Sequence, residues 1–399
     1  MAPAPSTIEP HFSRKGIARP VSVMHLLHTM AYGGVETAVI NWLLRIDRER
    51  FTPHLVVFSN PDHSESHFVT AAEAAGLTVH KIPWGRRKPL WKAARALSAL
   101  MREKNVQVLH THNWYADFVG ALAARFVPVK TITTVYVWSD FDWKRNLLQW
   151  IDRYVIRSFD IVSAHCSDTY RKTLSLGVPA SHLRTLICGF EAPKVDLPPD
   201  VRAHMRRQMG VGDDEFLLVN VARLYPEKAQ DSLLRIFKRL LERCPQCRLW
   251  IAGIGPLEAQ LKAYCAELGL ESKVDFVGFV EDLPNFLALV DLHVNSSMAE
   301  GVPLAICSGM AAGLPIVATA VGGLPDVILQ GKTGILVEAG NETAFVDAVE
   351  RLVRDSEDRR RLGSAARRFI ETEYSLDHAV RQIENTYLEL VANCASESL

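Results

Sequence analysis

The chain has 399 residues, of which 48% are hydrophobic and 23% are charged. This is ordinary globular composition, which excludes wholesale disorder, and the length favours two domains of roughly 150–200 residues each. The 45 Lys and Arg residues balance the 45 Asp and Glu residues, so no overall positive field recruits nucleic acid or anionic lipid, and any such contact needs a local patch.

The ends and the cysteines indicate a cytoplasmic protein. Residues 1–20 mix Pro, Ala, Ser and Thr without the apolar core of a signal peptide, so we expect a disordered tail. Seven cysteines, an odd number spread thinly, fit a reducing compartment better than a disulfide framework. Cys244 and Cys247 form a lone C-x-x-C, which predicts two cysteines at a helix end rather than a zinc or redox site. The uncharged stretch 301–325 holds three prolines and five glycines, so it predicts buried helix, turn and strand rather than a membrane span.

Strand-like and helix-like segments alternate along the first half of the chain. Short apolar runs predict strands at 21–27, 54–58, 79–82, 108–110, 130–135 and 161–164. Helical patterns lie between them at 34–44, 68–75, 90–104 and 143–157. This alternation is typical of βαβ units, in which a parallel sheet carries helices on both faces.

A second series of strands begins near residue 216. Its members are expected at 216–221, 248–252, 274–276, 292–295, 316–318 and 334–337. The segment 191–199 between the two series is rich in proline and non-periodic, which indicates a linker. We therefore predict one Rossmann-like domain at 21–190, another at 191–375, and a terminal helical segment at 376–399.

Two doubly wound domains that face each other direct the carboxyl ends of their strands and the amino ends of their helices into a shared cleft. Free backbone N–H groups and helix dipoles favour anionic ligands there. The pattern thus supports nucleotide or phosphate binding, but it does not choose a reaction.

Two loops after strands carry residues suited to phosphate. Gly33 and Gly34 follow the first strand, and paired glycines let backbone approach a phosphate closely, although a simple turn is the alternative. No G-x-G-x-x-G is present, which argues against a dinucleotide site. Arg223 and Lys228 follow the first strand of the second domain, where a guanidinium fork and an ammonium could close on one diphosphate. The alternative is two solvated cations.

Two further loops of the second domain suggest a ligand cleft. Gly253 and Gly255 follow the strand at 248–252, at the edge where such loops gather. Glu300 precedes Gly301 at an expected helix start, where a carboxylate can bind sugar hydroxyls while the following N–H groups face an anion. A helix-capping glutamate is the alternative.

His110 and His112 mark the end of the strand near residue 108. We expect one imidazole to face the cleft and the other to face the protein interior. A metal site would need further ligands, and the local sequence offers none, so no metal is expected.

In order along the chain, these residues form a set that resembles the retaining glycosyltransferases of family 4. The motifs are G-G-V-E, H-T-H-N, V-A-R-L-Y-P-E-K, I-A-G-I-G-P, G-F-V-E-D-L-P, E-G-V-P-L, M-A-A-G-L-P-I-V-A-T and G-G-L-P-D. The resemblance spans about residues 21–390 and is stronger in the second domain. It implies the GT-B fold, with two Rossmann-like domains around the active site and a last helix that crosses back onto the first domain.

The resemblance also implies a donor site for a UDP- or GDP-linked sugar in the second domain. Arg223 and Lys228 would grip the diphosphate, Gly253 and Gly255 would allow its close approach, and the backbone near Val280 would contact the base. Glu300 would bind the donor sugar. The adjoining backbone N–H groups would come from the segment Gly301, Val302, Pro303 and Leu304.

From the first domain, the resemblance implies that Gly33 and Gly34 meet the phosphates and that His112 faces the transferred sugar. No protein nucleophile is implied, because a phosphate oxygen takes the acceptor proton as the diphosphate leaves. Such a reaction needs cationic groups around the diphosphate and tight positioning of the substrates. The donor loops supply this cradle without a D-x-D motif, so neither a metal nor a cofactor is expected.

Three positions depart from the family pattern. Position 308, where a second glutamate usually binds the ribose, is Ser308, whose hydroxyl lacks a charge-assisted bond of about 1.5–3 kcal/mol. Ala229 stands where glycine usually follows the lysine, and Cys188 with Gly189 replaces an Asn-Gly before the linker. These changes leave the fold intact and bear on donor affinity.

The acceptor side is marked by an aromatic and basic segment. Its aromatic residues are Tyr136, Trp138, Phe141, Trp143 and Trp150, and its basic residues are Lys144, Arg145, Arg153 and Arg157. Such a surface could dock a glycan, a lipid-linked sugar or the inner face of an anionic membrane, and a helix with an ordinary core face is the alternative.

The sequence therefore predicts a retaining, metal-independent hexosyltransferase that uses a nucleotide diphosphate sugar and a glycan or lipid-linked acceptor in bacterial polysaccharide or glycolipid biosynthesis. A non-catalytic GT-B scaffold that binds a nucleotide sugar or a partner is the alternative, favoured by Ser308. An epimerase would need a carboxylate and histidine set that the sequence does not identify, and the missing dinucleotide fingerprint excludes an NAD-dependent oxidoreductase.

Overall fold

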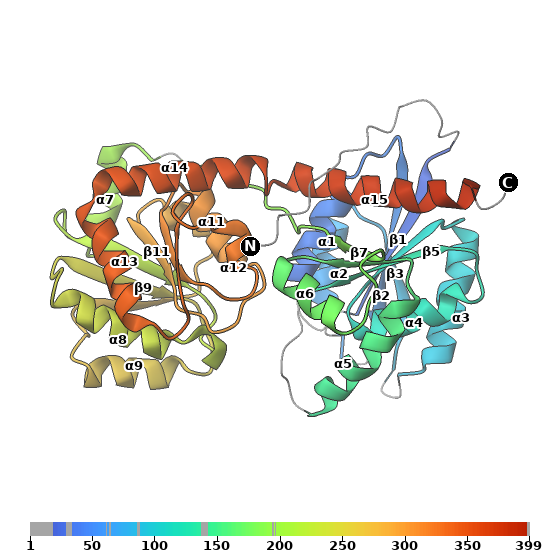
Figure 1. Ribbon diagram of the computed structural model, residues 1–399, viewed down its shortest axis with the longest axis horizontal. Coiled ribbons are helices and arrows are strands. Elements are labelled where there is room, and N and C mark those ends of the chain that lie inside the picture. Colours follow the sequence, from blue (N-terminus) through green and yellow to red (C-terminus); the bar gives the residue numbers. More distant parts are fainter. Residues whose placement is uncertain are drawn as a thin grey trace.

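The computed structural model describes residues 19–28, 34–60, 62–63, 65–85, 88–136, 143–193, 195 and 197–396. In this part of the chain, two α/β domains lie side by side, and helices α14 (Ser356–Thr372) and α15 (Leu376–Ser396) run along the same side of both (Figure 1). The two parallel-sheet domains predicted from the alternation of strands and helices are confirmed.

The amino-terminal domain is built on a parallel sheet of seven described strands. They are β1 (Val21–Leu27), β2 (Phe51–Ser59), β3 (Val79–Pro83), β4 (Val108–His112), β5 (Lys130–Val135), β6 (Ile161–Ala164) and β7 (Leu183–Thr185). Their order across the sheet is β3-β2-β1-β4-β5-β6-β7. All seven residues of β1 are buried, as expected for a central parallel strand covered by helices on both faces.

The helices of this domain form two layers around the sheet. They are α1 (Gly34–Arg45), α2 (Ser66–Ala74), α3 (Leu90–Glu103), α4 (Trp114–Ala124), α5 (Trp143–Val155) with the 3-10 turn η1 (Ile156–Ser158), and α6 (Ser167–Ser175). Helix α4 packs between α3 and α5, whereas α1 packs against α15. In Figure 1, α5 lies at the edge of the domain farthest from α15.

The carboxy-terminal domain repeats the plan with six described strands, in the order β10-β9-β8-β11-β12-β13. These are β8 (Phe216–Val221), β9 (Cys247–Ala252), β10 (Val274–Gly278), β11 (Leu292–Asn295), β12 (Ile316–Thr319) and β13 (Ile335–Val337). The helices and turns are α7 (Pro199–Gln208), η2 (Pro226–Lys228), α8 (Gln230–Leu241), α9 (Glu258–Glu267), α10 (Leu283–Leu287), α11 (Leu304–Ala311), α12 (Leu324–Val327) and α13 (Glu342–Arg354).

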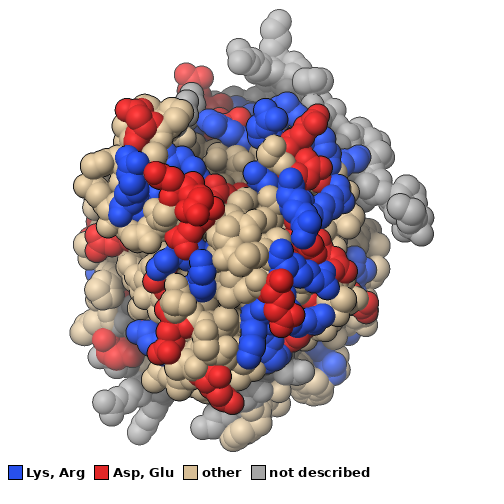
Figure 2. All heavy atoms as spheres, turned by 90° about the vertical axis from the view of Figure 1, so that its left-hand side faces the viewer, with Lys and Arg blue, Asp and Glu red and all other residues tan. Residues whose placement is uncertain are grey.

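Helices α8 and α13 show how this domain is held at its outer end. Each buries an apolar face at helical spacing, and the two pack together over the sheet. At the surface, Arg243 binds both Asp347 and Glu350 across the two helices. Figure 2 views this end of the domain, where basic and acidic side chains intermingle. Because such exposed pairs contribute little individually, the apolar faces supply most of the stability.

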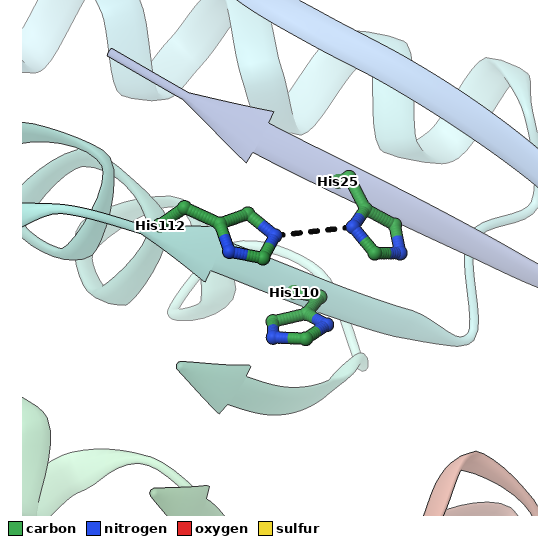
Figure 3. Close-up of side chains that lie close together, drawn as sticks. All are labelled: His25, His110 and His112. Atoms are coloured by element: carbon green, nitrogen blue, oxygen red, sulfur yellow. Dashed lines mark hydrogen bonds between the residues drawn. The ribbon is translucent and has the colours of Figure 1, made fainter. Parts of the chain in front are cut away.

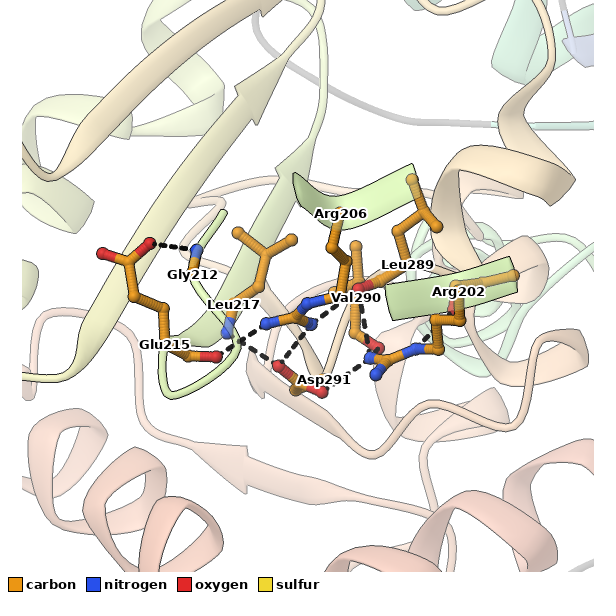
Figure 4. Close-up of polar contacts among 9 residues, drawn as sticks. Arg202, Arg206, Gly212, Glu215, Leu217, Leu289, Val290 and Asp291 are labelled. Atoms are coloured by element: carbon orange, nitrogen blue, oxygen red, sulfur yellow. Dashed lines mark hydrogen bonds and ion pairs between the residues drawn. The ribbon is translucent and has the colours of Figure 1, made fainter. Parts of the chain in front are cut away.

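Helix α7 is anchored at the amino ends of the strands, away from the cleft edge. Arg202 and Arg206 both bind the carboxylate of Asp291, at 2.7 and 2.9 Å, and Arg206 also donates to the carbonyl oxygens of Leu289 and Glu215 (Figure 4). A cavity of about 730 Å³ adjoins these side chains. Since both guanidinium groups bind carbonyl and carboxylate oxygens of the domain, the cluster fastens α7 to it.

The chain crosses between the domains twice, and the two crossings touch. The N–H of Phe190 donates to the carbonyl oxygen of Tyr374, and the N–H of Leu376 donates to that of Phe190. Gly189, at φ +70°, lies so close to the start of α15 that a Cβ there would come within 2.6 Å of the Ala379 Cβ. The glycine of the unusual Cys-Gly pair is thus required by close packing as well as by its backbone conformation.

Some elements differ from those expected. No range was predicted from the sequence for strand β7 or for helices α4, α6, α7, α8, α9, α10 and α12, and β4 extends two residues farther than predicted. The predicted disordered tail falls on residues 1–18, outside the described residues, and on 19–20. Among the helices that are described, none combines the length and the apolarity needed to cross a bilayer.

Candidate active site

Sheet topology places the candidate site. In the amino-terminal sheet the strand order reverses between β1 and β4, and in the other sheet it reverses between β8 and β11. Ligands of open α/β sheets bind beyond the carboxyl ends of the strands at such switch points. Gly34, His112, Arg223 with Lys228, and Glu300 lie at or just after the carboxyl ends of these four strands, so most of the predicted chemistry lies at the two switch points.

Lys228 and Glu300 form the centre of the carboxy-terminal half of the site. The ammonium Nζ lies 2.7 Å from Glu300 Oε1, and the side chains are only 13% and 6% exposed. Ser297 donates from Oγ to the same carboxylate oxygen at 2.8 Å. The hydroxyl of Ser296 in turn donates to the carbonyl oxygens of Lys228 and Ala229, which ties the loop after β11 to the loop after β8. The pair is therefore held in place before any ligand binds.

Arg223 occupies a different environment from Lys228. Its side chain is 67% exposed, and its only ionic contact within the described residues is a 3.5 Å approach to Glu227. The guanidinium lies over the Tyr225 ring, 4.8 Å from the centroid, and the Arg223 carbonyl accepts from Gln230 Nε2. The backbone is thus fixed while the cation remains available to a ligand.

The glycines after β9 have a packing role that the sequence did not reveal. A Cβ at Gly253 would lie 2.0 Å from the carbonyl oxygen of Ala222, and one at Gly255 would lie 2.3 Å from that of Leu224. Only glycine permits these backbones to pass so closely. The space that a side chain would need is filled by the loop that carries Arg223, so both glycines support that loop directly.

The loop after β11 leads into helix α11. Pro303 is at its N-cap, where no side-chain cap bond occurs among the described residues, so the first turn can offer its N–H groups to an anion. Ser308, one turn farther, donates its hydroxyl back to the Leu304 carbonyl oxygen at 2.9 Å. Gly301 and Val302, which precede Pro303, are half-buried. Val280, after β10, packs partly buried against the core of this domain.

The two domains approach each other directly at the site. A Cβ at Gly34 would lie 3.9 Å from Leu304 Cδ1, and one at Gly301 would lie 2.9 Å from His165 Nε2. The N–H of Ser167, at the start of α6, donates to Asp326 Oδ2 at 2.6 Å. Asp326 therefore supplies the anionic cap that favours the amino end of α6, from across the domain boundary.

The environment of His112 differs from the expectation. His110 and His112 lie on the same side of β4, with ring centroids 4.3 Å apart, and His25 from β1 joins them (Figure 3). Residues two apart along a strand share a face, so the expectation that the two imidazoles diverge was wrong. His112 is 0% exposed. That it faces the transferred sugar, as the resemblance implies, stays a prediction.

The three histidines belong to a continuous buried hydrogen-bond network. His112 pairs with Tyr136 through Nδ1 and with His25 through Nε2, at 2.9 and 3.1 Å. The Tyr387 hydroxyl from α15 bridges His25 Nε2 and His110 Nδ1, at 2.9 and 2.7 Å. His110 Nε2 completes the network with the hydroxyl of a threonine on β5. All six ring nitrogens thus have a partner.

This network keeps the imidazoles neutral. Burial lowers the pKa of His25 to about 3 and holds the pKa values of His110 and His112 well below their usual range. One ligand atom from each imidazole lies within 4.8 Å of the others, which is a spacing that metal ions use. Because every ring nitrogen is already paired inside a closed core, a metal would have to displace existing hydrogen bonds, and the cluster is better explained as a structural link between β1, β4 and α15.

The family is decided by comparison with known proteins. Residues 23–189 match the glycosyl transferase 4-like domain, and residues 201–369 match the glycosyl transferases group 1 family. The chain belongs to the glycosyl transferases group 1 family. Its amino-terminal domain is accordingly of the glycosyl transferase 4-like type, and the resemblance recognised in the motifs is confirmed.

This glycosyltransferase is similar to enzymes of several specificities. It is 25% identical to N-acetyl-alpha-D-glucosaminyl L-malate synthase of Bacillus anthracis, over 75% of this chain and 78% of that protein. It is 27% identical to the GDP-mannose-dependent alpha-(1-6)-phosphatidylinositol monomannoside mannosyltransferase of Mycolicibacterium smegmatis, over 79% and 85%. The crystal structure of Anabaena HepE in complex with UDP superposes with a TM-score of 0.81 at 20% identity, covering 92% of this chain and all of that one. The GT-B fold is thereby confirmed.

Some site residues fall outside the description or were missed. Gly33, Trp138 and Phe141 lie outside the described residues, as do the side chains of Lys144 and Arg145. Sequence reasoning missed His165 and Asp326 as contacts between the domains. Asp326 belongs to the G-G-L-P-D motif, and this was the available signal, whereas His165 stands in no motif.

Proposed function

We propose that this glycosyltransferase transfers a hexose from a nucleotide diphosphate sugar to a glycan or lipid-linked acceptor, with retention of configuration and without a metal ion. The observation that carries the proposal is the buried Lys228–Glu300 pair, 2.7 Å apart, beside the amino end of α11. It combines a fixed cation for a diphosphate with a fixed carboxylate for sugar hydroxyls.

In the proposed reaction the acceptor oxygen forms a bond to the anomeric carbon on the face from which the diphosphate departs. The electrons of the broken bond go to the diphosphate, one of whose oxygens takes the acceptor proton. Lys228 and Arg223 neutralise the charge that develops on the leaving group. The short distance between Glu300 and Lys228 keeps the carboxylate oriented toward the donor sugar, so positioning supplies much of the catalysis.

The relatives support a sugar nucleotide donor and leave its base open. The mycobacterial enzyme is named for GDP-mannose and a phosphatidylinositol mannoside, whereas the Anabaena structure contains UDP. A lipid-linked acceptor in glycolipid or polysaccharide assembly is the acceptor class that we propose. Ser308 favours the second candidate function, a scaffold that binds a donor without turnover, because its hydroxyl is engaged with Leu304.

The proposed metal independence concerns the donor loops. A D-x-D triplet does occur elsewhere in the sequence, at Asp140-Phe141-Asp142, outside the described residues. Assays with excess EDTA test this part directly. Loss of transfer in EDTA that Mg²⁺ restores would refute metal independence while leaving the transferase assignment intact.

The central experiment compares Lys228→Met with Lys238→Met, an exposed lysine on α8 that serves as a matched control. Thermal unfolding is measured with UDP, GDP, ADP and NAD in EDTA, and transfer is followed with the sugar of the stabilising nucleotide. We expect one nucleoside diphosphate to stabilise wild type and the control but not Lys228→Met, whose turnover falls at least 100-fold. NMR of the product then reports anomeric configuration. Full turnover in Lys228→Met would refute the assignment, and donor binding without turnover in wild type would favour the scaffold.

A further inference from the structure

Helix α5 exposes its largest apolar side chains on the protein surface. Its side chains at positions 143, 147, 150, 151 and 154 are Trp, Leu, Trp, Ile and Tyr, and all five are exposed. At 100° per residue these positions fall within one arc of about 100°, so they form a single outward face. Trp143 is 71% exposed and Trp150 is 51% exposed.

The fully buried side chains that are described on α5 are polar. They are Gln149 and Asp152, and Asp152 is only 2% exposed, whereas Leu148 and Val155 are half-buried. Burial, together with the nearby Asp117, raises the pKa of Asp152 well above its usual range. Val155 packs on the domain core, but the largest apolar side chains of α5 point away from it.

The outward face is also cationic. The Arg153 guanidinium lies over the rings of Trp150 and Tyr154, 5.1 and 4.7 Å from the centroids, and that of Arg157 lies 4.9 Å from the Tyr154 centroid. In the sequence, Asp152 is the only acidic residue from 143 to 158, and Asp140 and Asp142 precede this stretch. Because the Asp152 side chain is buried, the surface combines large apolar groups with positive charge.

Charge complementarity selects the occupant of this surface. Two copies meeting through α5 would bring the arginines of both together, which disfavours self-association. Tryptophan and tyrosine settle at the level of lipid headgroups, and arginine beside them pairs with anionic phosphates. We propose that the outward face of α5 docks this glycosyltransferase on an anionic lipid surface.

The location of α5 suits such docking. It lies at the edge of the amino-terminal domain farthest from the return helix α15 (Figure 1), so binding there does not obstruct the crossings between the domains. The inference does not depend on the proposed reaction, because the surface is separate from the donor loops. It is consistent with an acceptor that is itself anchored in the membrane.

The test is co-sedimentation of the full chain with vesicles of phosphatidylcholine alone or containing phosphatidylglycerol. We expect wild type to bind the anionic vesicles, with binding that weakens as salt rises. The double variant Trp143→Ser/Trp150→Ser should bind at least tenfold more weakly. Trp91→Ser, which alters an equally exposed tryptophan on α3, should bind like wild type.

Two further measurements make each outcome decisive. Arg153→Glu should weaken binding to anionic vesicles only, and nucleotide-dependent thermal stabilisation should persist in every α5 variant, which shows that the donor domain is intact. The proposal is overturned if wild type ignores anionic vesicles, or if the double variant and Trp91→Ser bind alike. A concentration-dependent dimer that the double variant abolishes would assign the face to a second copy and would also overturn it.

Discussion

Replacing one buried carboxyl tests how the stability of the amino-terminal domain depends on pH. Asp117 on α4 is buried, and its Oδ1 accepts hydrogen bonds from the hydroxyls of Thr111 and Thr133 at 2.5 and 2.6 Å. Burial raises its pKa from 3.8 to about 7. The substitution Asp117→Asn keeps an accepting side-chain oxygen at this position but removes the titratable group, so it isolates the cost of ionisation.

The sign and size of the expected change in stability with pH follow from proton linkage. A carboxyl whose pKa is raised on folding stabilises the folded state fully below its unfolded pKa, and this stabilisation is lost as pH rises through the folded pKa. The shift from 3.8 to about 7 corresponds to roughly 4 kcal/mol at 1.36 kcal/mol per pKa unit. Asp152 is a second nearby carboxyl whose pKa is raised. We therefore expect Asp117→Asn to remove about 2–4 kcal/mol of the pH-dependent change in the free energy of unfolding.

The assay is urea unfolding of wild type and Asp117→Asn between pH 4.5 and 8.5, followed by tryptophan fluorescence. The free energy of unfolding of wild type should fall relative to the variant as pH rises, with most of the change complete by about pH 8. Asp213→Asn, at an exposed aspartate, serves as the control and should run parallel to wild type. Parallel curves for Asp117→Asn and wild type would refute a raised pKa at this site.

Two other substitutions test local conformation and the buried network. Ala229 has the left-handed conformation, φ +49° and ψ +43°, so Ala229→Gly should raise the free energy of unfolding by about 0.5–1 kcal/mol. Gly210→Ala, at an open site with φ +75°, should lower the free energy of unfolding. Calorimetry that shows a change of the same sign for both variants would contradict this reasoning. Tyr387→Phe leaves two buried imidazole nitrogens unpaired and should cost about 2–4 kcal/mol in urea unfolding. Tyr374→Phe removes a buried hydroxyl that has no partner in the described part of the chain and should be neutral or stabilising, so equal losses for the two tyrosines would refute the network.

The alternation of strands and helices was readable because it is local. A buried parallel strand such as β1 is an apolar run of seven residues, and glycines and cations follow such runs at the switch points. The loops that carry Arg223, Lys228 and Glu300 were found from this pattern together with the family motifs. That the structure brings Lys228 within 2.7 Å of Glu300 was beyond reach, because it depends on β8 and β11 being neighbours.

What the sequence concealed depends on contacts between distant residues. His25 stands inside an apolar strand and gives no local signal, and only the register of β1 on β4 sets it opposite His110. Tyr387 is 362 residues from His25. The exposure of the large apolar side chains of α5 was equally unpredictable from the sequence. A periodic pattern shows that a helix has two faces but not which of them packs on the core.

The return helix α15 helps to explain why the imidazole at the end of β4 is buried. Tyr387 caps the cluster from α15, and His112 is joined through His25 to that hydroxyl and through its own Nδ1 to Tyr136. Neutral imidazoles donate through one nitrogen and accept through the other. A different hydrogen bond at Tyr136 would therefore require donors and acceptors to exchange along this hydrogen-bonded series. His112 therefore holds the Tyr136 hydroxyl in place, and Gly34, His165 and Ser167 make contacts across the domain boundary.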